Sequence, residues 1–200
     1  MGVRILALLL CLLGGGMLFK SFWIEAKAWL AEGLIETAWQ HTLAGEGPTA
    51  PWPWADTWPV ARLESPRLGI TRLVLNGDSG AAMAFGPGWT EHTTLPGEEG
   101  RSFISGHRDT HFRFLKDLLI GDELKVQRAD GKIVVFRVAE SQIVDQQQGW
   151  HISLEGPQEL LLVTCYPFDA VMPGGPMRYI VRAEKTVESG GPHIPYPEDI

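Results

Sequence analysis

Apolar residues dominate the start of the chain. Residues 5–19 form an unbroken apolar run of fifteen residues, which resumes after Lys20 over residues 22–24. A membrane-spanning helix needs about 20 apolar residues. The lysine can extend its charged end to the membrane surface, and the two aromatic residues that follow it are typical of that interface. We therefore expect residues 1–24 to be an N-terminal transmembrane helix that serves as a membrane anchor.

A cleaved signal peptide is the competing interpretation of this segment. Ala26 and Ala28 have the spacing of a signal-peptidase site. However, small neutral residues are expected before such a site, and this chain instead carries Lys20, Trp23 and Glu25. The pattern favours an uncleaved anchor.

Residues 25–59 differ from the segments on either side. Residues 21–40 have a helical composition and are expected to continue the membrane helix outward, whereas residues 44–59 are rich in proline and favour an extended, semi-rigid linker. Six of the eight tryptophans precede residue 60. They either rest on the membrane interface or pack onto the domain that follows, and the pattern leaves both possibilities open.

From residue 60 onward the apolar positions alternate in short segments, which is typical of β-strands. Polar loops are expected at 90–100 and 141–149, and short helices at 78–85 and 112–119. Strands are expected as two segments within 60–75 and at 101–106, 123–127, 132–139, 160–164 and 177–183, with an Asp-Gly hairpin turn at 130–131.

The spacing of these elements indicates the fold class. Short strands separated mostly by turns, without alternating long helices, favour an all-β fold. We expect residues 60–185 to form a closed eight-stranded β-barrel with one or two short helices. Residues 186–200 lack any periodicity and should form a flexible tail.

Composition and charge exclude some classes of protein. The net charge is −7, and no basic run is present, which argues against nucleic acid as a partner. Charged residues make up 20% and hydrophobic residues 44% of the 200 residues, which is typical of a globular protein and not of a disordered one.

The cysteines and histidines direct attention to one end of the predicted barrel. Cys11 lies in the apolar run, so Cys165, at the end of a strand, is the only thiol of the soluble part. An unperturbed thiol is only about 3% ionised at neutral pH and needs a nearby imidazole or guanidinium to become a good nucleophile. Among the six histidines, His107 stands out because it follows a strand directly after Ser105 and Gly106.

A metal site is the alternative use of this histidine. His107 and His111 form an H-x-x-x-H pair, but Cys165 has no partner cysteine and no glutamate has zinc-protease spacing. We therefore expect neither a metal nor a cofactor.

An arginine completes the candidate site. Arg178 follows Cys165 by thirteen residues, across a loop rich in proline and glycine. A hairpin would place both residues on neighbouring strands, where the guanidinium can hydrogen-bond an oxyanion. Arg108 and Arg182 are the rival candidates for this role.

Three motifs resemble those of the sortase family of cysteine transpeptidases. Residues 161–165 (LLVTC) resemble the TLxTC signature with Leu161 in place of its threonine, residues 105–115 resemble the histidine segment, and residues 177–183 resemble the strand that opens with the family's arginine. The linker and the AFGPG segment at 84–88 look like the proteobacterial branch, class GN.

This resemblance implies a function, a set of catalytic residues and a location. Cys165 would attack an LPxTG-like C-terminal sorting signal of an exported protein to form a thioester, His107 would act as acid and base, and Arg178 would stabilise the oxyanion. An amine acceptor would resolve the thioester. The loop 166–176 and the connection 141–154 would form walls of the peptide groove. The domain would lie on the periplasmic side of the inner membrane.

Two other functions fit parts of the pattern. An L,D-transpeptidase-type cysteine acyl-transferase would have a glycine directly before its cysteine, whereas this chain has Thr164. A membrane-anchored binding domain on a sortase-like barrel would need no catalytic residues, whereas His107, Cys165 and Arg178 are all present.

Overall fold

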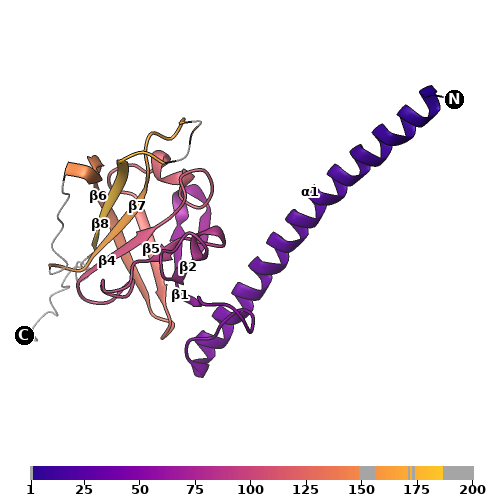
Figure 1. Ribbon diagram of the computed structural model, residues 1–200. Helices are drawn as coiled ribbons and strands as arrows, with labels where there is room; N and C mark the ends of the chain where they lie inside the picture. Colours follow the sequence, from indigo (N-terminus) through magenta and orange to yellow (C-terminus); the bar gives the residue numbers. More distant parts are fainter. Residues whose placement is uncertain (1, 149–155, 171, 173, 187–200) are drawn as a thin grey trace, which may run out of the picture.

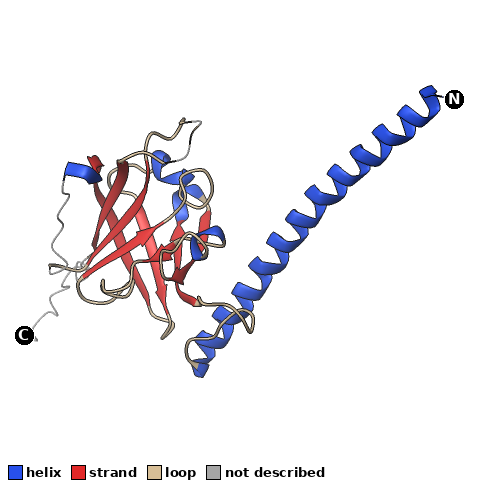
Figure 2. Ribbon diagram, viewed as in Figure 1, coloured by secondary structure: helices blue, strands red, loops and turns tan. Residues whose placement is uncertain are grey.

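The computed structural model describes residues 2–148, 156–170, 172 and 174–186. A long N-terminal helix leads into a barrel of strands (Figures 1 and 2). The expected tail at 186–200 lies outside the described residues apart from its first position.

The expected all-β closed barrel of eight strands is confirmed. The strand order around it is β1-β2-β3-β4-β7-β8-β6-β5. The strands are β1 (Pro59–Ser65), β2 (Ile70–Asn76), β3 (Gly88–Trp89), β4 (Arg101–Ser105), β5 (Glu123–Arg128), β6 (Ile133–Asp145), β7 (Glu159–Cys165) and β8 (Met177–Lys185).

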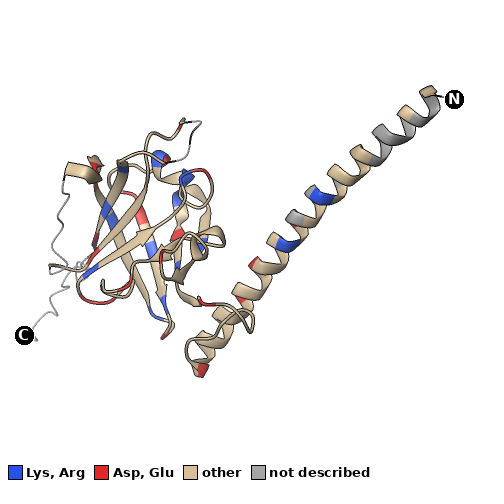
Figure 3. Ribbon diagram, viewed as in Figure 1, with Lys and Arg blue, Asp and Glu red and all other residues tan. Residues whose placement is uncertain are grey.

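Alternating side chains close the barrel around one core. In β1 every second residue is buried, so one face packs inward and the other is partly exposed. In β7 the first four residues are all buried, because Leu160 and Leu162 face the main core while Leu161 packs in a second cluster with Phe103 and Ile180. Leu63, Val126, Phe136 and Leu162 meet in the interior. Acidic and basic residues are interspersed over the strands (Figure 3).

The two short helices are shorter than the sequence predicts. The segment 78–85 contains only a 3-10 helix at Ala82–Ala84, and 112–119 contains one at Arg113–Asp117. Ser79 accepts a hydrogen bond from the backbone N–H of Ala82, at 3.2 Å, as a capping residue does. Segments of about eight residues form too few helical hydrogen bonds to offset the cost of helix nucleation.

One strand boundary and one whole strand also differ from the prediction. The expected loop at 141–149 is wrong over its first half, because β6 continues to Asp145 and pairs with β8 from Ser141↔Val181 to Asp145↔Met177. Side chains there are exposed or half-buried, so hydropathy does not reveal the strand. The two-residue strand β3 was not predicted. It bridges β2 and β4 and completes the barrel.

The helix α1 (Gly2–His41) is continuous, as expected for residues 21–40. Its C-terminal part packs against β1 and β2 through buried Ile35, Ala38 and Trp39. Glu36 pairs with Arg62 of β1. The N-terminal part projects away from the barrel (Figure 1).

The structure answers the question of the tryptophans only in part. Trp39 is fully buried between the helix and the barrel, whereas Trp29 and Trp54 are 79% and 83% exposed. Within the described residues, no helix is both long enough and apolar enough to cross a membrane. The membrane anchor therefore remains a prediction from the sequence.

Candidate active site

Three neighbouring strands bring the candidate residues to one end of the barrel. β4 runs parallel to β7, and β7 runs antiparallel to β8. The C-terminal ends of β4 and β7 therefore meet the start of β8. Cys165 is the last residue of β7, and Arg178, the second residue of β8, is its direct cross-strand partner. The hairpin expected from the sequence thus joins these two residues.

His107 is tied to the same end through the backbone of Gly106. The N–H of Gly106 donates to the carbonyl of Val163 at 3.0 Å, which extends the β4–β7 pairing past the end of the strand. The buried hydroxyl of Thr164 donates to the carbonyl of Gly106 at 2.7 Å. These bonds place the residue after Gly106 level with Cys165, the residue after Thr164.

The exposure of the three side chains suits a reaction with an external substrate. His107 is exposed, while Cys165 and Arg178 are half-buried at the rim of the barrel. Cys165 is a free thiol. Arg178 donates to the carbonyls of Gly175 and Met177 at 2.8 and 2.9 Å. No carboxylate of the described residues pairs with Arg178, so its guanidinium keeps donors for a ligand.

The rival arginines have other partners. Arg182 pairs with Glu140, Glu159 and Glu184, and the hydrogen bond to Glu140 is the main reason why its pKa is raised. Its donors are therefore engaged away from the thiol. Arg108 is buried and hydrogen-bonded to Asp109 and to the loop that follows β7.

An aromatic cluster lies beside the thiol and was not predicted. The ring of Phe168 makes edge contacts with Tyr166 and Tyr179, with centroids 6.3 and 5.1 Å apart. The N–H of Tyr166 donates to the carbonyl of Met177 at 3.1 Å, which extends the β7–β8 pairing. The cluster thus gives the loop beside Cys165 an apolar base. Its sequence signal was the alternation of aromatic residues directly after Cys165.

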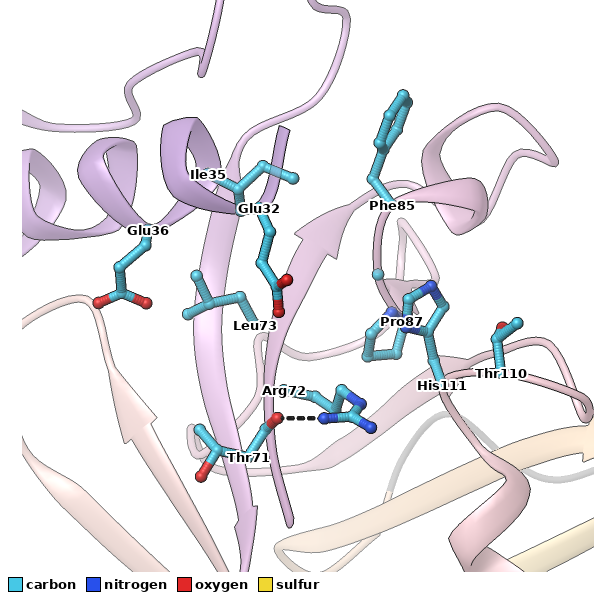
Figure 4. Close-up of a pocket in the computed structure, with 11 residues that line it drawn as sticks. Glu32, Ile35, Glu36, Thr71, Arg72, Leu73, Phe85, Pro87, Thr110 and His111 are labelled. Atoms are coloured by element: carbon cyan, nitrogen blue, oxygen red, sulfur yellow. Dashed lines mark hydrogen bonds between the residues drawn. The ribbon is translucent and has the colours of Figure 1, made fainter. Parts of the chain in front are cut away.

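His111 lies in a different place from the candidate catalytic residues. It lines a cavity of about 510 Å³ between α1, β2 and the segment 85–87 (Figure 4). Burial lowers the pKa of His111, and this effect outweighs a hydrogen bond with the Ala84 backbone that raises it. In the described part of the chain, no group of three His, Cys, Asp or Glu residues is arranged to hold a metal ion.

Comparison with known proteins identifies the family. The chain matches the Sortase domain over residues 63–186, which is more than half of its length. The protein belongs to the sortase family. It is similar to Sortase D of Bacillus subtilis (strain 168), with 32% identity over 124 residues. This alignment covers 62% of each chain, so the sortase-like part spans somewhat less than two thirds of that relative.

Solved sortase structures share the fold. A Sortase D5 transpeptidase from Clostridium perfringens gives a TM-score of 0.62 at 20% identity, covering 79% of this chain and 99% of that chain. Sortase A from Corynebacterium diphtheriae gives 0.57 at 20% identity, with 80% and 86% covered. At this level of identity the likeness supports the barrel architecture. Assignment to the proteobacterial class GN stays a prediction.

Proposed function

We propose that this sortase-family protein is a cysteine transpeptidase. It cleaves an LPxTG-like sorting signal at the C-terminus of an exported protein and transfers the acyl group to an amine. The observation that carries the proposal is the cross-strand pairing of Cys165 with Arg178. This pair lies at the end of the barrel where Gly106, the residue before His107, is hydrogen-bonded to Thr164. A nucleophile, an acid/base and an oxyanion donor are what acyl transfer requires.

The reaction divides between the three side chains. The Cys165 thiolate attacks the scissile carbonyl, and the oxyanion that forms is stabilised by the Arg178 guanidinium. The C–N bond then breaks, His107 protonates the departing amine, and a thioester remains on Cys165. An acceptor amine attacks the thioester, gives up its proton to His107 and forms the new amide as the thiolate leaves.

The test uses the full chain in detergent with a panel of LPxTG-like peptides, with and without hydroxylamine. We expect a thioester adduct on Cys165 and peptide hydroxamate only when hydroxylamine is present, both measured by mass spectrometry. Substituting Cys165→Ala or His107→Ala should abolish turnover, and Arg178→Ala should lower it at least about 100-fold, as does loss of an oxyanion donor.

Two results would contradict this mechanism. Cleavage that survives Cys165→Ala would exclude a thioester, and peptide binding without cleavage or adduct would favour the binding domain. Arg72→Ala is a suitable control, because this arginine lines the cavity beside α1 and pairs with none of the three residues.

We further propose that the protein is anchored in the inner membrane with its barrel in the periplasm. The support is the apolar run at 5–19 together with the exported nature of sorting substrates. The anchor predicts resistance to alkaline carbonate extraction, and the orientation predicts that protease digests the barrel in spheroplasts without lysis. Release by carbonate, or protection until lysis, would overturn the corresponding half of the proposal.

A further inference from the structure

Arg108 is a buried cation next to the candidate catalytic histidine. Only 4% of its surface is exposed. Its Nε and Nη2 donate to the two carboxylate oxygens of Asp109 at 2.9 and 3.1 Å. The other hydrogen bonds of its guanidinium go to a different part of the chain.

These other bonds reach the loop that follows Cys165. Nη1 of Arg108 donates to the carbonyl of Pro167 at 2.6 Å, and Nη2 donates to the carbonyl of Ala170 at 2.9 Å. The two carbonyls belong to the second and fifth residues after the thiol. One side chain from the segment after β4 therefore fixes the start of the β7–β8 loop.

The pattern of bonds depends on the shape of the guanidinium. Arginine carries five N–H donors in a rigid planar fork, and Arg108 uses it to reach one carboxylate and two carbonyls at once. A lysine ammonium keeps the charge but lacks this span. Pairing with Asp109 is the main reason why the pKa of Arg108 is raised, so the group stays charged across the working pH range.

Few other hydrogen bonds hold this part of the loop. Between Tyr166 and Ala170, the other backbone hydrogen bonds within the described residues are the Tyr166 bond to Met177 and a long bond of 3.4 Å from Ala170 to Pro167. Within the described residues, the Arg108 bonds are therefore the main polar restraint that ties Pro167 and Ala170 to the rest of the barrel.

We propose that Arg108 is a positioning residue for the sorting-signal peptide. It holds the start of the β7–β8 loop against the histidine segment, so that the wall beside Cys165 is formed before the peptide binds. This inference rests on the proposed transpeptidase function. A wall formed in advance removes the entropic cost of ordering the loop during binding, and thereby lowers KM for the peptide.

The proposal predicts a separation between binding and chemistry. Arg108 bonds the loop and not the reacting atoms, so its loss should weaken peptide binding more than it slows acyl transfer. A small alkylating reagent needs no peptide groove, so it should reach Cys165 in either case. In Arg108→Lys the positive charge near the thiol is kept, and only the fork is lost.

The test compares the full-length wild type with Arg108→Lys and Arg113→Lys. Arg113 is an exposed arginine five residues further on and serves as the matched control. In Arg108→Lys we expect KM for an LPxTG-like peptide to rise about tenfold or more, while kcat and the iodoacetamide rate change less than about threefold. Amide hydrogen exchange at residues 166–170 should become faster. Arg113→Lys should resemble the wild type in all four measurements.

The outcomes separate this proposal from the transpeptidase function. Unchanged KM and unchanged exchange in Arg108→Lys would overturn the positioning role, and so would a fall in kcat alone. If the wild type turns over no peptide, the proposed function fails, whereas exchange at 166–170 still tests whether Arg108 holds the loop. If Arg108→Lys does not fold, Asp109→Asn takes its place and should give smaller changes in the same direction. No change in Asp109→Asn would then overturn the proposal.

Discussion

At the scale of single residues, the site depends on how closely the chain can approach its neighbours. Gly106 has no side chain, and a Cβ atom built there would lie 2.7 Å from Cγ of Phe112. Phe112 is fully buried, and its N–H donates to the carbonyl of His107 at 3.0 Å. The glycine therefore allows the phenylalanine to pack directly beneath the histidine segment.

Substituting Gly106→Ala should displace the Phe112 ring. We expect the free energy of unfolding to fall by about 1–3 kcal/mol, as for other cases of core overpacking. Because the backbone of His107 is hydrogen-bonded to that of Phe112, displacing the ring should also lower kcat/KM for the peptide. Urea denaturation and steady-state kinetics measure the two effects. Gly80→Ala is the control, since no atom lies within 4 Å of a Cβ there, and equal effects at both glycines would refute the packing argument.

At the scale of elements, α1 and the barrel enclose a cavity that contains a titratable group. The residues that line it include His111 from the segment after β4, Glu32 from α1 and Arg72 from β2 (Figure 4). Burial is the first cause of the lowered pKa of His111, and the charges of Arg72 and His107 lower it further, whereas Glu32 opposes the shift. The stability of the fold is therefore linked to pH through His111.

The sign of this linkage follows from the direction of the shift. The unfolded chain binds the His111 proton more readily than the folded chain, whose pKa is lowered. This contribution to stability is complete above the ordinary histidine pKa of about 6.5, and it is lost as the pH falls from there through the folded value. In urea denaturation, the wild type should lose more stability between about pH 7.5 and 5.5 than His111→Gln. Parallel profiles would exclude His111 as the source.

The elements also show which features a sequence can reveal. The strand ends at Cys165 and Arg178 could be predicted because their strands are apolar and the residues between them break regular structure. The end of β6 at 141–145 could not, because its pairing with β8 uses backbone groups while its side chains remain polar. The hydrogen bonds of Arg108 could not be predicted for a similar reason. Its partners are backbone carbonyls 59 and 62 residues away. Every residue has a backbone carbonyl, so the sequence does not indicate which ones accept these bonds.

At the scale of the whole molecule, the two ends of the barrel have different chemistry. The end opposite the candidate site is joined by ion pairs across β4, β7, β8 and β6. Arg182 of β8 pairs with Glu140, Glu159 and Glu184, and Arg101 of β4 pairs with Glu159 at 2.6 Å. Glu159 is only 4% exposed and accepts from both arginines. This ion-pair network cross-links the strands whose other ends carry the candidate site.

Substituting Glu159→Gln should therefore separate stability from catalysis. The variant leaves Arg101 and Arg182 partly buried without their shared carboxylate, and we expect the free energy of unfolding to fall by about 2–4 kcal/mol. The exposed pair of Glu123 with Arg137 provides the control, since Glu123→Gln should lower the free energy of unfolding by less than about 1 kcal/mol. Urea denaturation measures both values.

Because the network lies at the far end of the barrel, kcat/KM per folded molecule should stay within about twofold of the wild type in both variants. A large loss of kcat/KM in folded Glu159→Gln would show instead that the ion-pair network governs the geometry of the site along the length of β7.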